Sequence, residues 1–131
     1  MAKLVHSMIR VLEEARSVDF YDKAFGLKVA DRVAFDGFTL IYLSNPETGF
    51  ELELTVNDGR TDAYDLGNGY GHLAVTVEDI EVEYKRFTDL GLTIGKLVEM
   101  PHKGKPFAKF FFVTDPDGYK TEVIQRGGRF Q

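Results

Sequence analysis

The feature that most constrains this chain is an internal repeat, because its second half follows the same order of segments as its first. Each half opens on a strand-like stretch with a histidine at or near its start, "LVHSMIRV" at 4–11 and "GYGHLAVTV" at 69–77. Apolar and polar or small residues alternate after His6 and after His72, which is the period of a strand with one covered face. Whatever fold the chain adopts must accommodate two copies of one unit.

A helical pattern follows each of these strands. Segments 13–26 and 78–91 carry apolar residues at helical spacing, namely Val18, Tyr21 and Phe25 in the first and Ile80, Tyr84 and Phe87 in the second. Both segments end at a glycine, Gly26 or Gly91, which suits the left-handed conformation that terminates many helices. The sequence therefore predicts one helix in each half.

Three strand-like runs complete each half. Their separators, such as Asp36-Gly37, "SNPETG", "HKGKP" and "DPDG", consist of residues typical of turns. The third run carries a glutamate in both halves, Glu53 in "FELELTV" and Glu122 in "YKTEVIQ". The predicted strands cover 27–34, 37–44, 49–56, 93–100, 106–114 and 118–125.

These patterns predict an α+β fold made of two tandem βαβββ modules. The modules cover 1–57 and 70–125, and the polar segment 58–69 links them within a single domain, 1–131. Each module has a helix that covers one face of its sheet, so the helix does not account for the other face. We expect a curved mixed sheet whose concave side holds a site.

Composition excludes several classes of function. The 131 residues carry a net charge of −5 without a block of like charges, which disfavours nucleic acid and anionic membranes as partners. There is no cysteine, so disulfides and thiolate ligands are excluded. No apolar run approaches the roughly 20 residues that span a bilayer. We expect a soluble cytoplasmic protein, and the charge balance leaves room for a small, discrete anionic ligand.

Period-2 alternation places potential metal ligands on the face opposite the core residues. His6 lies on a face with Met8 and Arg10, and Glu53 lies on a face with Thr55 and Asn57. In the second half the equivalent positions are His72 and Glu122, while the third histidine, His102, falls in the "PHKGKP" turn and is expected to be exposed. Two imidazoles and two carboxylates suit an octahedral divalent transition metal, with two positions left for water or substrate.

An ordinary structural interpretation competes with a metal site. A single strand histidine is more often a hydrogen-bonded or exposed residue, and a strand glutamate usually faces solvent, as we expect for Glu51. The recurrence of one histidine and one glutamate at matching places favours ligation. His6 and Glu53 are 47 positions apart, and His72 and Glu122 are 50 positions apart. The pattern alone leaves both interpretations open.

The chain resembles the vicinal oxygen chelate superfamily and, within it, short bacterial glyoxalase I. The similarity runs from residue 3 to 125 and is carried by "LVHSMIRV", "SVDFYDKAFGLKV", "FELELTVN", "YDLGNGYGHLAVTV" and "FFVTDPDGYKTEVIQ". The resemblance implies metal ligands at His6, Glu53, His72 and Glu122. A histidine at the first ligand position and the absence of long insertions resemble the class activated by nickel or cobalt rather than zinc.

The resemblance also implies a substrate, the hemithioacetal of glutathione and methylglyoxal. By similarity, Arg10 and Asn57 hold a glutathione carboxylate, and Lys103 holds the substrate from the loop before the penultimate strand, with Lys105 as an alternative. An arginine suits bidentate capture of a carboxylate better than a lysine. The residues after Asn57 are "DGR", where many relatives have an aromatic residue, so the thiol site departs from the family pattern.

In the family's reaction a base moves a proton from C1 to C2 of the hemithioacetal. Glu122 is the expected base, with Glu53 as the partner carboxylate, and a homodimer that shares ligands between chains is typical of the family. Other superfamily enzymes, such as thiol transferases, epimerases or extradiol dioxygenases, usually have three protein ligands. Metal-free binding proteins, such as those that sequester bleomycin, form another alternative.

Overall fold

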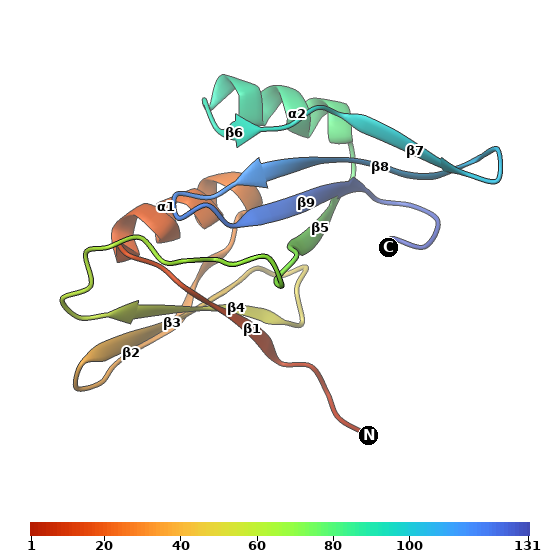
Figure 1. Cartoon of the computed structure of the whole chain (residues 1–131). Helices are drawn as coiled ribbons and strands as arrows, with labels where there is room; N and C mark the ends of the chain where they lie inside the picture. The colour runs from red at the N-terminus through yellow and green to blue at the C-terminus, as the bar shows by residue number, and fades with distance from the viewer. The chain divides into compact units, whose positions relative to one another are not determined.

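A mixed four-stranded sheet and one helix form the first of two units, Met1–Asp65 (Figure 1). The computed structural model describes all 131 residues. The strand order is β1-β4-β3-β2, in which β1 and β4 are parallel and the other neighbours are antiparallel. The elements in chain order are β1 (His6–Arg10), α1 (Glu14–Phe25), β2 (Lys28–Ala34), β3 (Phe38–Ser44) and β4 (Glu51–Asn57).

The second unit, Leu66–Gln131, repeats this arrangement with an additional strand. Its strand order is β5-β9-β8-β6, and β7 also pairs with β8. Again the first and last strands, β5 and β9, are parallel. Its elements are β5 (Leu73–Val77), α2 (Ile80–Asp89), β6 (Thr93–Ile94), β7 (Val98–His102), β8 (Lys105–Thr114) and β9 (Lys120–Gln125). The predicted α+β class and the two βαβββ-like modules are confirmed.

The single strand predicted over 93–100 is wrong, because it is divided into β6 and β7. Ile94 pairs with Val113 and Val98 pairs with Phe110, so β6–β7 use one residue more than β8 over the same stretch. Residues 95–97 belong to neither strand, so the ladder with β8 is interrupted between β6 and β7. The Gly95 amide still donates to the Phe112 carbonyl at 2.9 Å, so the chain remains against β8.

The predicted left-handed glycines follow both helices: Gly26 (φ 65°) comes directly after α1, and Gly91 (φ 72°) comes after Leu90, the C-cap of α2. The buried stripe of α1 differs from the expected one, since it passes through Ser17, Phe20, Tyr21 and Ala24. Val18 and Phe25 therefore lie at its border. Neither helix is long and apolar enough to cross a membrane.

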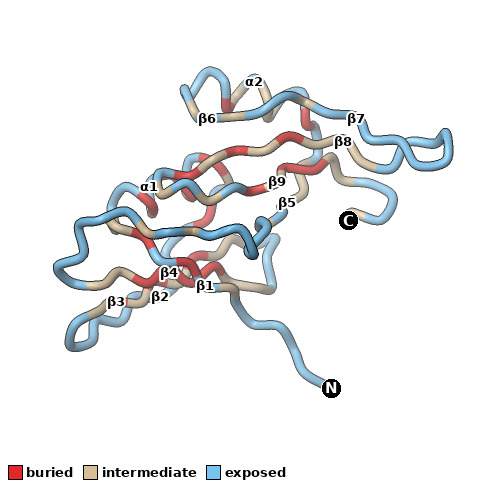
Figure 2. Tube along the Cα trace, in the orientation of Figure 1, coloured by how far each residue is buried: buried red, intermediate tan, exposed pale blue.

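The core of each unit lies between its helix and the central strands of its sheet, as the buried segments in Figure 2 show. In the first unit the fully buried side chains include Tyr21, Ile41, Leu43 and Leu54, and in the second they include Ile80, Phe87, Phe111, Val113 and Val123. These strand residues alternate with those of the opposite sheet face. The alternation fixes which side chains of β4 and β9 face away from the helices.

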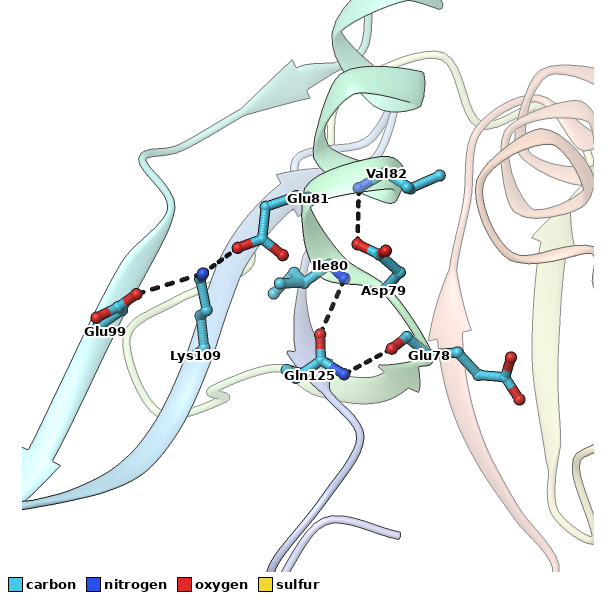
Figure 3. A network of polar contacts seen from close by, with 8 residues as sticks. All are labelled: Glu78, Asp79, Ile80, Glu81, Val82, Glu99, Lys109 and Gln125. Carbon is cyan, nitrogen blue, oxygen red and sulfur yellow. Dashed lines mark hydrogen bonds and ion pairs between the residues drawn. The ribbon is translucent and has the colours of Figure 1, made fainter.

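Polar contacts tie the start of α2 to the sheet of the second unit (Figure 3). The Gln125 amide oxygen accepts the Ile80 amide at 3.0 Å, and its nitrogen donates to the Glu78 carbonyl at 2.7 Å. Asp79 caps the helix by accepting the Val82 amide at 3.1 Å. Two amides of the first helical turn thus find partners outside the helix backbone, as helix starts require.

Gln125→Leu is expected to lower the free energy of unfolding by about 1–2 kcal/mol, because it leaves the Ile80 amide and the Glu78 carbonyl without this partner. Chemical denaturation followed by circular dichroism measures the change. Gln131→Leu is the matched control, since the Gln131 side chain contacts only the exposed tail, through the Gly128 carbonyl. Equal stability of the two variants would contradict this role of Gln125.

Candidate functional site

The first unit brings His6 and Glu53 together. His6 opens β1, where it lies opposite Glu51 of the parallel strand β4, and Glu53 is the next residue of β4 on the same face. The His6 Nε2 and Glu53 Oε2 atoms are 3.6 Å apart. The glutamate side chain is 11% exposed and the histidine side chain 40%, so the carboxylate is largely buried and the imidazole is partly accessible.

The second unit repeats this pair with His72 and Glu122. His72 directly precedes β5, whose Ala74 lies opposite Glu122 of the parallel strand β9. The His72 Nε2 and Glu122 Oε1 atoms are also 3.6 Å apart. Side-chain exposure is 39% for His72 and 19% for Glu122. The internal repeat has thus produced two pairs of nearly identical geometry.

The donor chemistry of each pair suits a divalent transition metal. Neutral imidazole nitrogen and carboxylate oxygen are ligands for such ions. Two ligand atoms at about 2.1 Å from one ion and at right angles lie about 3 Å apart, so a separation of 3.6 Å needs little rearrangement. No group of three or more potential ligand side chains lies together, so each unit supplies a pair of donors.

An aromatic residue lies across the sheet from each carboxylate. Tyr42 of β3 is opposite Glu53, and its ring is edge-on to His6 with centroids 6.0 Å apart. Phe112 of β8 is opposite Glu122, and its ring is edge-on to His72 at 4.9 Å. The sequence analysis missed both residues. Each lies on the strand that precedes its glutamate in the chain, and this position is the signal that could have identified it.

Tyr42 also has a polar contact with the pair. The neighbouring Glu53 carboxylate raises the pKa of Tyr42 above its ordinary value, and burial and other nearby negative charges act in the same direction. Tyr42 therefore remains a neutral phenol beside this carboxylate. Phe112, opposite Glu122, has no hydroxyl group.

Arg10 and Asn57 occupy the far ends of β1 and β4. Arg10 lies opposite Thr55, so its diagonal neighbour is Asn57, as Glu53 is the diagonal neighbour of His6. The Asn57 amide nitrogen donates to the Tyr64 hydroxyl at 2.9 Å. Arg60 stacks over the same ring, 4.2 Å from its centroid. Tyr64 thus places an aromatic residue beside Asn57, a neighbour that the sequence analysis did not identify.

Lys103 lies at the tip of the β7–β8 hairpin. His102 pairs with Lys105, so the connection has only two residues, Lys103 and Gly104. Both have positive φ, 52° and 75°, as the favoured two-residue hairpin turn requires. The expectation that His102 belongs to the turn is wrong, because this short turn leaves it in β7, although it is exposed.

A separate cavity of about 600 Å³ lies in the second unit between this hairpin and the C-terminal tail. Lys109 and Gln125 line it, together with the apolar side chains of Met100 and Phe107. The tail folds back, with the Phe130 ring 5.7 Å from Phe107. Neither His72 nor Glu122 lines this cavity, so it is distinct from the pair in this unit.

Comparison with known proteins gives a family match over most of the chain. The model of the Glyoxalase/Bleomycin resistance protein/Dioxygenase superfamily matches residues 3–123. A probable lactoylglutathione lyase of Synechocystis is 39% identical over 131 residues, which cover 96% of this chain and 97% of the relative. A lactoylglutathione lyase of Neisseria meningitidis is 41% identical over 132 residues, 95% of this chain and 91% of the relative.

Solved structures show the same similarity. The trypanothione-dependent glyoxalase I of Leishmania major superposes with a TM-score of 0.79 at 34% identity, over 95% of this chain and 87% of that chain. Glyoxalase I of Zea mays gives a TM-score of 0.81 at 32% identity, over 96% of this chain and 45% of that chain. Sequence and backbone therefore point to the same family.

Lys103→Asn is expected to raise the free energy of unfolding by about 0.5–1 kcal/mol, because asparagine tolerates positive φ better than lysine. Thermal unfolding followed by circular dichroism tests this. Lys105→Asn is the matched control, since Lys105 lies in β8 without positive φ and the same change gives no such gain. A Lys103→Asn variant no more stable than the control would show that the turn places no strain on Lys103.

Proposed function

The chain belongs to the Glyoxalase/Bleomycin resistance protein/Dioxygenase superfamily, and we propose that it is a glyoxalase I, which converts the hemithioacetal of methylglyoxal and glutathione into S-lactoylglutathione. Curated lactoylglutathione lyases of similar length, at 39% and 41% identity, support this lyase activity. One observation of the structure carries the proposal. Each unit presents a histidine and a glutamate from neighbouring parallel strands, with their ligand atoms 3.6 Å apart.

We further propose that His6, Glu53, His72 and Glu122 together hold one divalent metal ion. Two pairs of nitrogen and oxygen donors make a four-ligand set that leaves two octahedral positions. Such an ion supplies Lewis-acid stabilisation of the negative charge that develops when a carbon acid loses a proton. The histidine at the first ligand position supports nickel or cobalt rather than zinc, by resemblance to the family class with that residue.

The remaining residues of the site bind and orient the substrate in this proposal. Arg10 and Asn57 hold a carboxylate of glutathione, and Lys103 reaches it from the hairpin tip. The diagonal relation of Arg10 to Asn57 supports their acting as one subsite, because it matches the relation of His6 to Glu53. The Tyr64 hydroxyl, 2.9 Å from the Asn57 amide nitrogen, fixes the orientation of that amide.

Glu122 serves as the base. Its carboxylate takes the proton from C1 of the hemithioacetal and returns it to C2, so the residue is regenerated and the reaction is an isomerisation. Glu53 is the partner carboxylate. The greater exposure of the Glu122 side chain, 19% against 11% for Glu53, supports this division because a base needs access to the substrate.

Each complete site needs donors from both repeats, and we propose a homodimer in which they are shared between chains. In that arrangement His6 and Glu53 of one protomer meet His72 and Glu122 of the other. The same residues within one chain form the alternative single-domain arrangement. Two intact pairs argue against a metal-free binding protein, because a binder has no need to keep four ligands.

Metal-stripped protein is expected to show no thioester formation from methylglyoxal and glutathione, followed by absorbance at 240 nm. Turnover should return on addition of nickel or cobalt, and more weakly with zinc, because the ion stabilises the developing charge. Metal uptake without turnover under any of these conditions would contradict the proposed reaction while leaving the metal site intact.

Glu122→Gln is expected to lower kcat by about 100-fold or more, because an amide cannot accept the proton. The circular dichroism spectrum should stay unchanged. Glu99→Gln is the matched control, since Glu99 lies on β7 beside Lys109 with a side chain 78% exposed. Near-normal turnover of Glu122→Gln would refute the assignment of this residue as the base.

A further inference from the structure

The loop that follows β4 closes a ring of contacts that begins and ends at Asn57. The chain turns at Gly59, whose φ is 76°, and the Arg60 amide donates to the Asn57 carbonyl at 3.4 Å. The Arg60 guanidinium stacks over the Tyr64 ring, 4.2 Å from its centroid. The Tyr64 hydroxyl accepts a hydrogen bond from the Asn57 side-chain amide at 2.9 Å, which closes the ring. All four residues belong to the first unit.

Arg60 is held by the backbone of this loop as well as by the aromatic ring. Its Nε donates to the Asp62 carbonyl at 2.7 Å, and its Nη2 donates to the Ala63 carbonyl at 3.1 Å. A planar guanidinium can make two such hydrogen bonds and stack on an aromatic face at the same time, which the ammonium group of a lysine cannot do. Arg60 therefore fixes the Tyr64 ring to the loop that carries both residues.

The contact with Tyr64 determines what the Asn57 side chain can offer to a ligand. The amide nitrogen of Asn57 carries two protons, and one of them is donated to the Tyr64 hydroxyl. The amide oxygen and the second proton remain for a ligand, in the orientation that this hydrogen bond sets. A mobile amide would have to be ordered when the ligand binds, and that ordering costs affinity. Holding the amide beforehand therefore favours binding.

We propose that Arg60 is a positioning residue for substrate binding, which acts on Asn57 through the Tyr64 ring. This inference rests on the proposed function, in which Asn57 and Arg10 hold one end of the thiol. It gives a role to segment 58–60, where the sequence departs from the family pattern. Arg60 does not touch the substrate in this proposal. Its effect is therefore on ground-state binding and on KM, whereas kcat and metal affinity depend on the two histidine–glutamate pairs.

Two substitutions break the ring of contacts at different places. Arg60→Met keeps a long side chain but removes the stacked cation and both hydrogen bonds to the loop. Tyr64→Phe keeps the aromatic ring and removes only the hydroxyl. Each change is expected to raise KM for the glutathione hemithioacetal by about 5-fold, with kcat and the dissociation constant for Ni²⁺ within about twofold of the wild type. Unchanged KM in either variant would overturn the proposal.

Each substitution has a matched control elsewhere in the chain. Arg16→Met removes an arginine that pairs with Glu13 at 3.0 Å, at the start of α1. Tyr84→Phe removes a hydroxyl that donates to the Gly95 carbonyl at 3.0 Å in the second unit. Both controls are expected to keep the KM of the wild type. A control whose KM rises as much as that of its test variant would overturn a role specific to the loop after β4.

The double variant Arg60→Met/Tyr64→Phe tests whether Arg60 acts through the Tyr64 hydroxyl. Its KM is expected to equal that of Tyr64→Phe alone, because the second change removes the group that the first one positions. A KM in which the two single effects multiply, to about 25-fold, would show that Arg60 acts independently of the hydroxyl. That result would overturn the indirect role.

A second measurement needs no turnover. The exchange rate of the Asn57 side-chain amide protons with water is measured by nuclear magnetic resonance, with the signals assigned by their loss in Asn57→Asp. Arg60→Met and Tyr64→Phe are expected to raise this rate by about 5-fold, because a hydrogen-bonded proton is protected from exchange. Tyr84→Phe is expected to leave it unchanged.

An exchange rate that does not change in Arg60→Met would overturn the positioning role of Arg60. A wild-type protein that does not convert the glutathione hemithioacetal would instead contradict the proposed function. In that case a faster exchange of the Asn57 protons in Arg60→Met would still support the action of Arg60 on Asn57, so the two failures are distinguishable.

Discussion

Parallel pairing of the first and last strands in each unit is the constraint on which the candidate site depends. Parallel neighbours cannot be joined by a hairpin, so β1 and β4 need a crossover connection, which here contains α1 and two further strands. The same holds for β5 and β9. This return places a residue from the start of each unit beside one from its end. His6 meets Glu53, and His72 meets Glu122, because of that single pairing.

The repeat preserves this geometry but not the chemistry around it. Both ligand pairs have the same separation, yet the cross-strand aromatic residue is Tyr42 in one unit and Phe112 in the other. The strand ends differ as well. The first unit has Arg10 and Asn57, whereas at the equivalent places the second unit has Thr76 and Arg126, whose side chains lie 3.4 Å apart. A duplicated backbone thus supports two equivalent histidine–glutamate pairs with unequal surroundings.

The sequence was sufficient to predict what depends on local pattern. Alternation and helical spacing predicted both modules, and Gly26 and Gly91 predicted both helix ends. The two-residue alternation of strands predicted that His6 and Glu53 lie on the same face of the sheet. The structure shows their side chains as a close pair. The predictions that failed were those that depend on contacts between distant segments. The division of 93–100 into β6 and β7 depends on the match of that stretch to β8, and the contact of Tyr64 with Asn57 depends on the path of a loop. Register and loop path are not visible in the periodicity of one segment.

The proposed metal site also explains why neither histidine–glutamate pair has to bind the ion tightly by itself. A histidine and a carboxylate supply only two donors, and each pair remains 39–40% exposed at its imidazole. If all four donors bind one ion, the ion is held only when both repeats contribute, so metal binding and the correct association of the repeats stabilise each other. In the proposed site the ion would then be a structural link as well as a Lewis acid. In this proposal one unit alone provides only two of the four donors, so the site needs both copies of the repeat.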